Sequence, residues 1–176
     1  MDYNSYTDKI GESGKIYYGE AGCGKTWTLC QLIYENRNNC IVFSHTNKAT
    51  VNIKKHLKFK FKMATDDVNK LCHTFESYFY DNVRGIDNLK DKIVLVDEYS
   101  MTPNSYITSL YQAFTKYNIT IIMSGDTNQC EPIKNTKSIR HNYFTSKSVS
   151  EMCPNHIEMK NILKEVPDMI MKEGLC

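Results

Sequence analysis

A short run near the N-terminus has the residue types needed to hold phosphate groups. Residues 19–26 read Gly-Glu-Ala-Gly-Cys-Gly-Lys-Thr, which fits the spacing G-x-x-x-x-G-K-[ST]. Small residues let backbone N–H groups turn toward an anion at a helix start, a lysine reaches the outer phosphates of a nucleotide, and a threonine hydroxyl binds magnesium. The candidate nucleotide-binding residues of this loop are Gly19, Glu20, Ala21, Gly22, Cys23, Gly24, Lys25 and Thr26. The alternative is an ordinary glycine turn with an incidental lysine.

Two adjacent carboxylates, Asp97 and Glu98, could supply the acid chemistry that a bound nucleotide needs. They follow directly on the apolar run at residues 93–96. A first carboxylate at such a place anchors Mg²⁺, and a second one orients the attacking water as a base. We therefore expect Thr26 and Asp97 to bind Mg²⁺. Lys25 and Glu98 are expected catalytic residues of ATP hydrolysis. The alternative is that acidic residues end a strand simply because strand ends meet solvent.

A third group of polar residues follows the apolar run at residues 119–123. Residues 125–132 read Gly-Asp-Thr-Asn-Gln-Cys-Glu-Pro and give the spacing Gly-Asp-x-x-Gln-x-x-Pro. Asp126 is a further candidate for nucleotide binding, and Gln129 is a further candidate for catalysis. A plain turn accounts for the Gly-Asp pair but leaves Gln129 and Pro132 unexplained.

The elements that must position these residues are the strands of a parallel sheet. Apolar runs alternate with helical patterns, as in an α/β fold. These runs lie at residues 15–18, 40–43, 93–96 and 119–123. Each predicted strand ends where candidate chemistry begins, and in open parallel sheets ligands bind outside the carboxyl ends of the strands. The sequence therefore predicts one shared site at that edge.

The segments between the strands carry weaker patterns. A helix behind the glycine-rich loop is predicted by apolar residues at roughly helical spacing, namely Trp27, Leu29, Leu32 and Ile33. A polar turn is expected at residues 44–47, followed by a helix to about residue 57, and another helix is expected at about residues 102–116. Residues 58–62 alternate lysine and phenylalanine, which is the period of a strand or extended ribbon. Beyond residue 141 we expect a helix at 148–152, a strand at 157–159 and a helical segment past Pro167.

Size, charge and cysteine content narrow the class of protein. A chain of 176 residues with 41% hydrophobic residues has the size of one domain with a real core. A net charge of +2 permits nucleic-acid binding without demanding it. Seven scattered cysteines form no Cys-x-x-Cys pair, so we expect free thiols in a reducing compartment. Since no apolar run suits a signal peptide or a membrane helix, we expect a soluble, intracellular protein without a membrane partner.

Together the three motifs resemble those of superfamily 1 helicases. Residues 19–26 are similar to motif I of that family, residues 96–101 to motif II and residues 125–132 to motif III. Two segments between them are similar to motif Ia, at residues 44–49, and to motif Ib, at residues 72–75. The resemblance runs from about residue 15 to residue 133 and is closest to the RecD-like superfamily 1B branch.

The resemblance implies an α/β, RecA-like P-loop NTPase domain with a mainly parallel sheet flanked by helices. It implies a core at residues 1–133, and we place residues 134–176 as a C-terminal extension of the same domain. ATP and Mg²⁺ are the implied cofactors. Gln129 is implied to touch the γ-phosphate and to couple its loss to movement of the nucleic-acid site. The implied activity is ATP hydrolysis coupled to binding of, or translocation on, single-stranded DNA or RNA.

The family resemblance places the nucleic acid at motifs Ia and Ib. The implied contact residues are Thr46, Asn47, His73, Thr74 and Phe75. A threonine and an asparagine at a helix start can hold a phosphate, and His73 or Phe75 could stack on a base. The alternatives are that Thr46 or Asn47 only caps a helix and that Phe75 only fills the core.

The lysine run at residues 54–62 has two equal interpretations. With Phe59 and Phe61 interleaved, it is a candidate electrostatic track for single-stranded nucleic acid with stacking groups. It is equally interpreted as a solvated face, because alternating lysines also protect an exposed edge strand from pairing.

The chain departs from the family in ways that limit its expected activity. No glutamine precedes the phosphate loop, where these helicases carry one that reads adenine, and nothing beyond Arg140 supplies the arginines of a second domain. Motifs IV to VI are absent, so we expect weak turnover in isolation and completion by a second helicase domain or a partner protein. The alternative functions are a regulatory or interaction module that binds ATP without turnover and, less favoured, a P-loop kinase for a small molecule.

Overall fold

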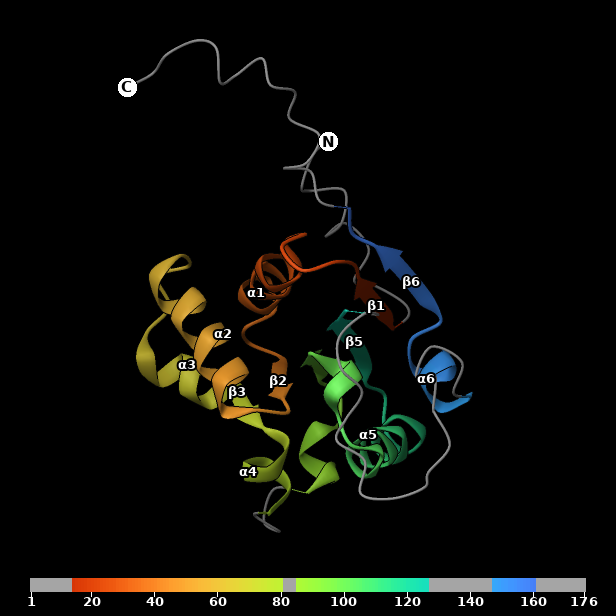
Figure 1. Cartoon of the computed structure of the whole chain (residues 1–176). Coiled ribbons are helices and arrows are strands. Elements are labelled where there is room, and N and C mark those ends of the chain that lie inside the picture. Colours follow the sequence, from red (N-terminus) through yellow and green to blue (C-terminus); the bar gives the residue numbers. More distant parts are fainter. Residues whose placement is uncertain (1–13, 81–84, 127–146, 161–176) are drawn as a thin grey trace, which may run out of the picture.

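The computed structural model describes residues 14–80, 85–126 and 147–160. Strands and helices alternate along this part of the chain, as Figure 1 shows. The elements are β1 (Lys15–Tyr18), α1 (Lys25–Glu35), β2 (Cys40–Ser44), α2 (Asn47–Phe59), α3 (Thr65–Leu71), β3 (Cys72–Thr74), α4 (Phe75–Tyr80), η2 (Ile86–Leu89), β4 (Ile93–Asp97), η3 (Tyr99–Met101), α5 (Asn104–Lys116), β5 (Thr120–Gly125), α6 (Lys147–Met152) and β6 (Asn155–Glu158).

The strands form one six-stranded sheet in the order β3-β2-β4-β5-β1-β6, and every pairing is parallel. Their carboxyl ends therefore meet at one edge. In register, Thr74 pairs with Ser44 and Ser44 with Asp97. On the other side of β4, Gly125 pairs with Tyr18. The four strands predicted from apolar runs are confirmed, and so is the predicted parallel α/β sheet flanked by helices.

Helices cover both faces of the sheet and bury one hydrophobic cluster on each. Leu29, Ile53 and Leu57 belong to the cluster under α1, α2 and α3. Phe75 and Leu110 belong to the opposite cluster, under α4 and α5. Figure 1 shows α1, α2 and α3 together on one side, with α5 and α6 on the other. Strands buried on both faces read as continuous apolar runs, which is why the sequence located them.

The expected strand or ribbon at residues 58–62 is wrong. Helix α2 continues to Phe59, and the chain then turns, with Lys62 at a φ of 56°. The reason is that buried apolar residues recur every four positions here, as on one face of a helix. Ile53 and Leu57 are fully buried, and Phe61, four residues further on, packs against the same cluster. A five-residue alternation is too short to outweigh that periodicity.

Two of the weaker expectations near the C-terminus are confirmed in position. The helix expected at residues 148–152 is α6, and the strand expected at 157–159 overlaps β6, which pairs with β1 along its whole length. The helix expected past Pro167 lies outside the described residues. The short elements α3, β3 and α4 were not expected as separate units.

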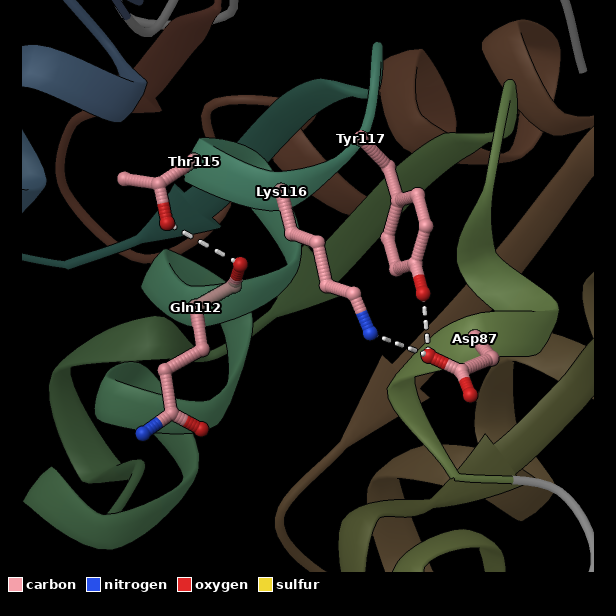
Figure 2. Close-up of polar contacts among 5 residues, drawn as sticks. All are labelled: Asp87, Gln112, Thr115, Lys116 and Tyr117. Atoms are coloured by element: carbon pink, nitrogen blue, oxygen red, sulfur yellow. Dashed lines mark hydrogen bonds and ion pairs between the residues drawn. The ribbon is translucent and has the colours of Figure 1, made fainter.

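Exposed polar contacts hold the segment before β4 against the end of α5. Asp87 of η2 accepts hydrogen bonds from the Lys116 ammonium, at 3.1 Å, and from the Tyr117 hydroxyl (Figure 2). The hydrogen bond from Tyr117, and after it the bond from Lys116, lower the pKa of Asp87 below its usual range. Thr115 caps the last turn locally by donating to the Gln112 carbonyl oxygen at 3.1 Å. Since this network is exposed, we assign it a local structural role.

Candidate nucleotide site and nucleic-acid surface

Glycines shape the loop between β1 and α1. Gly22 and Gly24 have φ values of 82° and 88°, in the left-handed region that residues with a Cβ avoid, and Gly24 is the N-cap of α1. Gly19 lies against the chain that follows β6, because a Cβ added there would come within 2.3 Å of the Met159 carbonyl oxygen. The glycines of the motif are therefore required by the shape of the loop.

Lys25 folds over this loop from the first turn of α1. Its ammonium donates to the carbonyl oxygens of Gly19 at 2.6 Å and Glu20 at 2.8 Å, and lies 3.6 Å from Cys23 Sγ. The first turn of α1 contains no acidic residue, so the positive end of the helix dipole has no counter-charge there. Lysine, helix end and glycine-rich backbone together form the arrangement that binds phosphate groups.

Asp97 ends β4 as a buried carboxylate. Its side chain is 6% exposed, and the hydroxyl of Ser124 donates to Oδ1 at 2.7 Å. Burial raises the pKa of Asp97, while the bond from Ser124, the backbone N–H of Glu98 and the nearby Lys25 ammonium act against that rise. The influence of Lys25 shows that the lysine of the phosphate loop and the acid of β4 lie within electrostatic reach.

Glu98 occupies an uncommon backbone conformation beside Asp97. Its φ and ψ are 52° and 44°, the left-handed region, which costs a residue with a Cβ about 1–2 kcal/mol. Partial burial, and then the negative charge of Asp97, raise the pKa of Glu98, whereas the ammonium of Lys48 on α2 lowers it. A carboxylate with a raised pKa is a better proton acceptor near neutral pH, as a general base requires.

Strand β5 contacts Asp97 and also Tyr99, the residue that follows the two acids. Besides the bond from Ser124, the ring of Tyr99 packs on Gly125, where an added Cβ would lie 2.7 Å from two ring carbons. The glycine of the third motif is therefore required by contact with Tyr99. Asp126 directly follows and is 6% exposed. Gln129 and Pro132 lie outside the described residues, so the expected role of Gln129 stays a prediction.

The residues present fit a magnesium ion that arrives with a nucleotide. Thr26 and Asp97 offer hard oxygen donors, and Mg²⁺ commonly takes only one or two protein ligands besides phosphate oxygens and water. Within the described residues, no group of three or more His, Cys, Asp or Glu side chains could hold a metal ion alone. When bound with ATP, Mg²⁺ would neutralise charge on the phosphates.

The loop after β2 places only one of its two expected residues at a surface hollow. Thr46 is the N-cap of α2, and its hydroxyl accepts from the Ala49 N–H at 3.1 Å, which agrees with the capping alternative. Asn47 lines a hollow of about 390 Å³. His45 and Tyr80 line the same hollow, and Tyr80 is 87% exposed.

The three residues expected to contact nucleic acid after α3 lie in three different environments. Thr74 lines the hollow with Asn47, and its hydroxyl oxygen accepts from the Ser77 N–H at 3.1 Å. His73 lines a different hollow, with Nε2 2.8 Å from the Lys70 carbonyl oxygen. Phe75 corrects the stacking expectation: its side chain is fully buried, so its ring is a core residue and is not available to a base.

Three residues of the site were missed from the sequence. Ser124 donates to Asp97, Tyr99 packs on Gly125, and Lys48 at the start of α2 lowers the pKa of Glu98. Ser124 and Tyr99 stand next to recognised motif residues, but only the pairing of β4 with β5 reveals their contacts. Lys48 lies within the motif Ia segment, and nothing in its sequence context indicates a carboxylate partner.

The phosphate loop after β1 and the paired acids after β4, with β5 between these strands, define a P-loop NTPase domain. A family model described as "AAA domain" matches residues 7–156. The chain therefore belongs to this AAA-domain family. No curated protein matches the chain in sequence.

Solved helicase structures share the fold. Pif1 helicase from Bacteroides, in complex with ADP-AlF3 and ssDNA, aligns with a TM-score of 0.67 and 18% identity over 96% of this chain and 43% of that one. Pif1 helicase from Candida albicans aligns with a TM-score of 0.59 and 19% identity over 84% of this chain and 36% of that one. Bacteroides Pif1 bound to ssDNA aligns with a TM-score of 0.51 and 23% identity over 75% of this chain and 33% of that one.

The likeness to these structures confirms the expected RecA-like P-loop fold. The chain spans less than half the length of the helicases that it matches. The RecD-like branch is not distinguished by these comparisons and stays a prediction. In the described ranges, no helix is both long enough and apolar enough to cross a membrane.

Proposed function

We propose that this chain is the ATP- and Mg²⁺-binding core domain of a superfamily 1 helicase, which couples ATP hydrolysis to single-stranded nucleic acid. The convergence of Lys25, Asp97 and Glu98 at one sheet edge carries the proposal. Lys25 comes from the loop after β1, whereas Asp97 and Glu98 come from the end of β4, and the pKa of each acid is lowered by a lysine from another motif, Lys25 for Asp97 and Lys48 for Glu98. An incidental glycine turn does not account for that arrangement.

In the proposed reaction Lys25 exchanges its loop carbonyls for the β- and γ-phosphate oxygens of ATP. Thr26 and Asp97 would hold Mg²⁺, and Glu98 accepts a proton from the water that attacks the γ-phosphorus. The bond from the γ-phosphorus to the bridging oxygen breaks, and ADP leaves with that oxygen. Gln129 is the proposed contact that reports loss of the γ-phosphate.

The proposed nucleic-acid site is the hollow that joins the loop after β2 to the start of α4. Asn47 and Thr74 offer polar groups to phosphate or sugar, and the exposed ring of Tyr80 is placed to stack on a base. Lys48, the residue after Asn47, influences Glu98. A strand that displaces the start of α2 would thereby change the charge around the base, which gives the two sites a physical connection.

The decisive experiment measures ATP hydrolysis of the purified chain with Mg²⁺, with and without oligothymidylate. We expect slow hydrolysis that the oligonucleotide stimulates and that Glu98→Gln abolishes while ATP binding is retained. Equal hydrolysis in Glu98→Gln would reject Glu98 as the base. ATP binding without hydrolysis under any condition would instead favour a regulatory module that uses the same fold.

A further inference from the structure

A row of aromatic rings lies on the outer face of α1, beside the phosphate loop. Trp27 and Tyr34 are seven residues apart on this helix, and Phe61, from the turn after α2, lies between them. The ring centroids of Trp27 and Phe61 are 5.1 Å apart, and those of Tyr34 and Phe61 are 5.5 Å apart. The guanidinium of Arg37 lies 4.6 Å from the Tyr34 centroid and extends the row. We call Trp27, Phe61 and Tyr34 the aromatic row.

Packing within the domain explains only the middle ring of this row. Phe61 is partly buried and packs against the cluster under α1 and α2. Trp27 and Tyr34, by contrast, are 40% and 38% exposed. The other apolar residues of the predicted helix, Leu29, Leu32 and Ile33, are buried. The row therefore presents flat ring surface to solvent in addition to anchoring the turn after α2.

Three lysines near Phe61 in the chain add positive charge beside the row. Lys60 and Lys62 flank Phe61 and are exposed, and Lys58 lies in the last turn of α2. Among the residues that the structure describes, no carboxylate lies within ion-pair distance of these three lysines. Glu35, the acidic residue nearest in sequence to Tyr34, accepts a hydrogen bond from Gln31 at 3.0 Å. A negatively charged ligand would complement these three lysines.

We propose that the aromatic row, with Lys58, Lys60 and Lys62, is a second binding surface for single-stranded nucleic acid. Exposed aromatic rings stack bases of any sequence, and unpaired lysines beside them neutralise the phosphates of the same strand. This surface is separate from the hollow at Asn47 and Tyr80, whose lining residues it does not share. Trp27 directly follows Thr26, so a strand bound here lies next to the nucleotide site.

The first test uses Trp27 as its own probe, because it is the only tryptophan of the chain. Oligothymidylate is added to the whole protein and to an Asn47→Ala/Tyr80→Ala variant, in which the hollow is impaired. We expect Trp27 fluorescence to fall in both proteins at similar oligonucleotide concentrations. Quenching that disappears in the variant would overturn the proposal, since Trp27 would then only sense binding at the hollow.

A control with nucleotide shows whether Trp27 responds to the bound strand or to the base of a nucleotide bound at the phosphate loop. Magnesium ADP is titrated in place of oligothymidylate, with Trp27 fluorescence as the measurement. Quenching by the strand in the presence of saturating magnesium ADP supports the proposal. Quenching by magnesium ADP but not by oligothymidylate would assign Trp27 to the nucleotide and overturn it. Stimulation of ATP hydrolysis is measured separately, so failure here leaves the proposed function testable.

The second test measures how salt weakens oligothymidylate binding. In the hollow-impaired variant, Lys60→Gln/Lys62→Gln should reduce the slope of log affinity against log salt by about 1.4, since each phosphate contact on a single strand contributes roughly 0.7. The matched control, Lys90→Gln/Lys147→Gln, removes two lysines elsewhere and should leave the slope unchanged. Equal slopes for the two pairs would overturn the proposal.

Ring loss is tested by Tyr34→Leu, which keeps apolar bulk at an exposed position. We expect binding to weaken about tenfold, because loss of one base–aromatic stack costs affinity of that order. Thermal unfolding checks that the variant is folded. A folded Tyr34→Leu variant with unchanged affinity would contradict stacking on the row.

Discussion

Replacing Ser124 with alanine tests whether β5 prepares Asp97 for magnesium. The Ser124 hydroxyl donates to Asp97 Oδ1 at 2.7 Å, and both side chains are buried, with exposed fractions of 1% and 6%. A hydrogen bond to a charged group contributes about 1.5–3 kcal/mol. Removing it withdraws that stabilisation from the ionised, correctly oriented carboxylate. Since 1.4 kcal/mol corresponds to a factor of ten, we expect Mg²⁺-dependent nucleotide affinity to fall roughly 10- to 100-fold.

The direction of the pH effect follows from the same contact. Burial already raises the pKa of Asp97, and the Ser124 bond opposes that rise. Ser124→Ala therefore raises the pKa of Asp97 further. Because Mg²⁺ needs the ionised carboxylate, the loss of binding at acid pH should begin at a higher pH in the variant than in the natural sequence.

The assay titrates Mg²⁺ into protein with a fluorescent ADP analogue, from acid to neutral pH. Ser44→Ala is the matched control, because Ser44 is also 1% exposed and its strand position pairs with Asp97, yet the hydroxyl bond to that carboxylate comes from Ser124. If the two alanine variants show the same Mg²⁺ dependence at every pH, the argument that Ser124 orients Asp97 is refuted.

Three further predictions concern the same edge of the sheet. Lys25→Ala should abolish ATP binding in calorimetry while the circular dichroism spectrum stays native, because its bonds join only atoms of the phosphate loop. Asp97→Asn should abolish the Mg²⁺ dependence of nucleotide binding. The same change should raise the Tm of the ligand-free protein, because it removes a buried charge, by about 2–4 °C for each kcal/mol gained in stability. Since the folded pKa of Asp97 is raised, the natural protein should lose stability as pH rises through that pKa, and this loss should be absent in Asp97→Asn. Iodoacetamide at neutral pH should modify Cys23 before Cys30, Cys40 and Cys72, because burial raises the pKa of these three thiols to about 12. Mass spectrometry should show that MgATP protects Cys23 from modification. Protection of no cysteine would place the nucleotide elsewhere.

The positions of the strands could be predicted because strands that are buried on both faces consist almost entirely of apolar residues. Ile93–Asp97 is buried on both faces of the sheet, so every residue of this strand before Asp97 is apolar. The same holds for Lys15–Tyr18 and Thr120–Gly125, where only ends are polar. The chemistry at the carboxyl ends could be predicted for the same reason, since parallel strands deliver their ends to a common edge.

Contacts across the sheet could not be predicted, because sequence gives strand positions but not strand order. Ser124 and Tyr99 act on residues of neighbouring segments only because β5 lies beside β4. Phe75 shows the reverse limit. Its motif resemblance implied an exposed ring, but stacking on Phe43 and Tyr106 at centroid distances of 4.9 Å and 5.0 Å holds it in the core.

Trp27 was predicted as one of several apolar residues at roughly helical spacing. That prediction did not separate the exposed Trp27 from the buried residues of the same helix. A helix with 3.6 residues per turn separates Trp27 from Leu29 by about 200°, so the two residues lie on opposite faces. The spacing of Trp27 and Tyr34, two turns apart, is the outer-face pattern, and it becomes visible only once Leu29 and Ile33 are known to face the sheet.

Within the described residues, no arginine lies at the phosphate loop. Lys25 is the cation placed on the phosphate loop, whereas Arg37, the one arginine within the described residues, lies beyond the end of α1 and is held by the Tyr34 carbonyl oxygen at 2.7 Å and by the Tyr34 ring. It therefore cannot reach the phosphates without leaving both partners and crossing the length of the helix. An arginine supplied to a transferring phosphate raises turnover by about 10³–10⁵ in related NTPases. On the proposed function we expect slow basal hydrolysis, and a partner that adds an arginine should raise the rate without changing Mg²⁺ affinity.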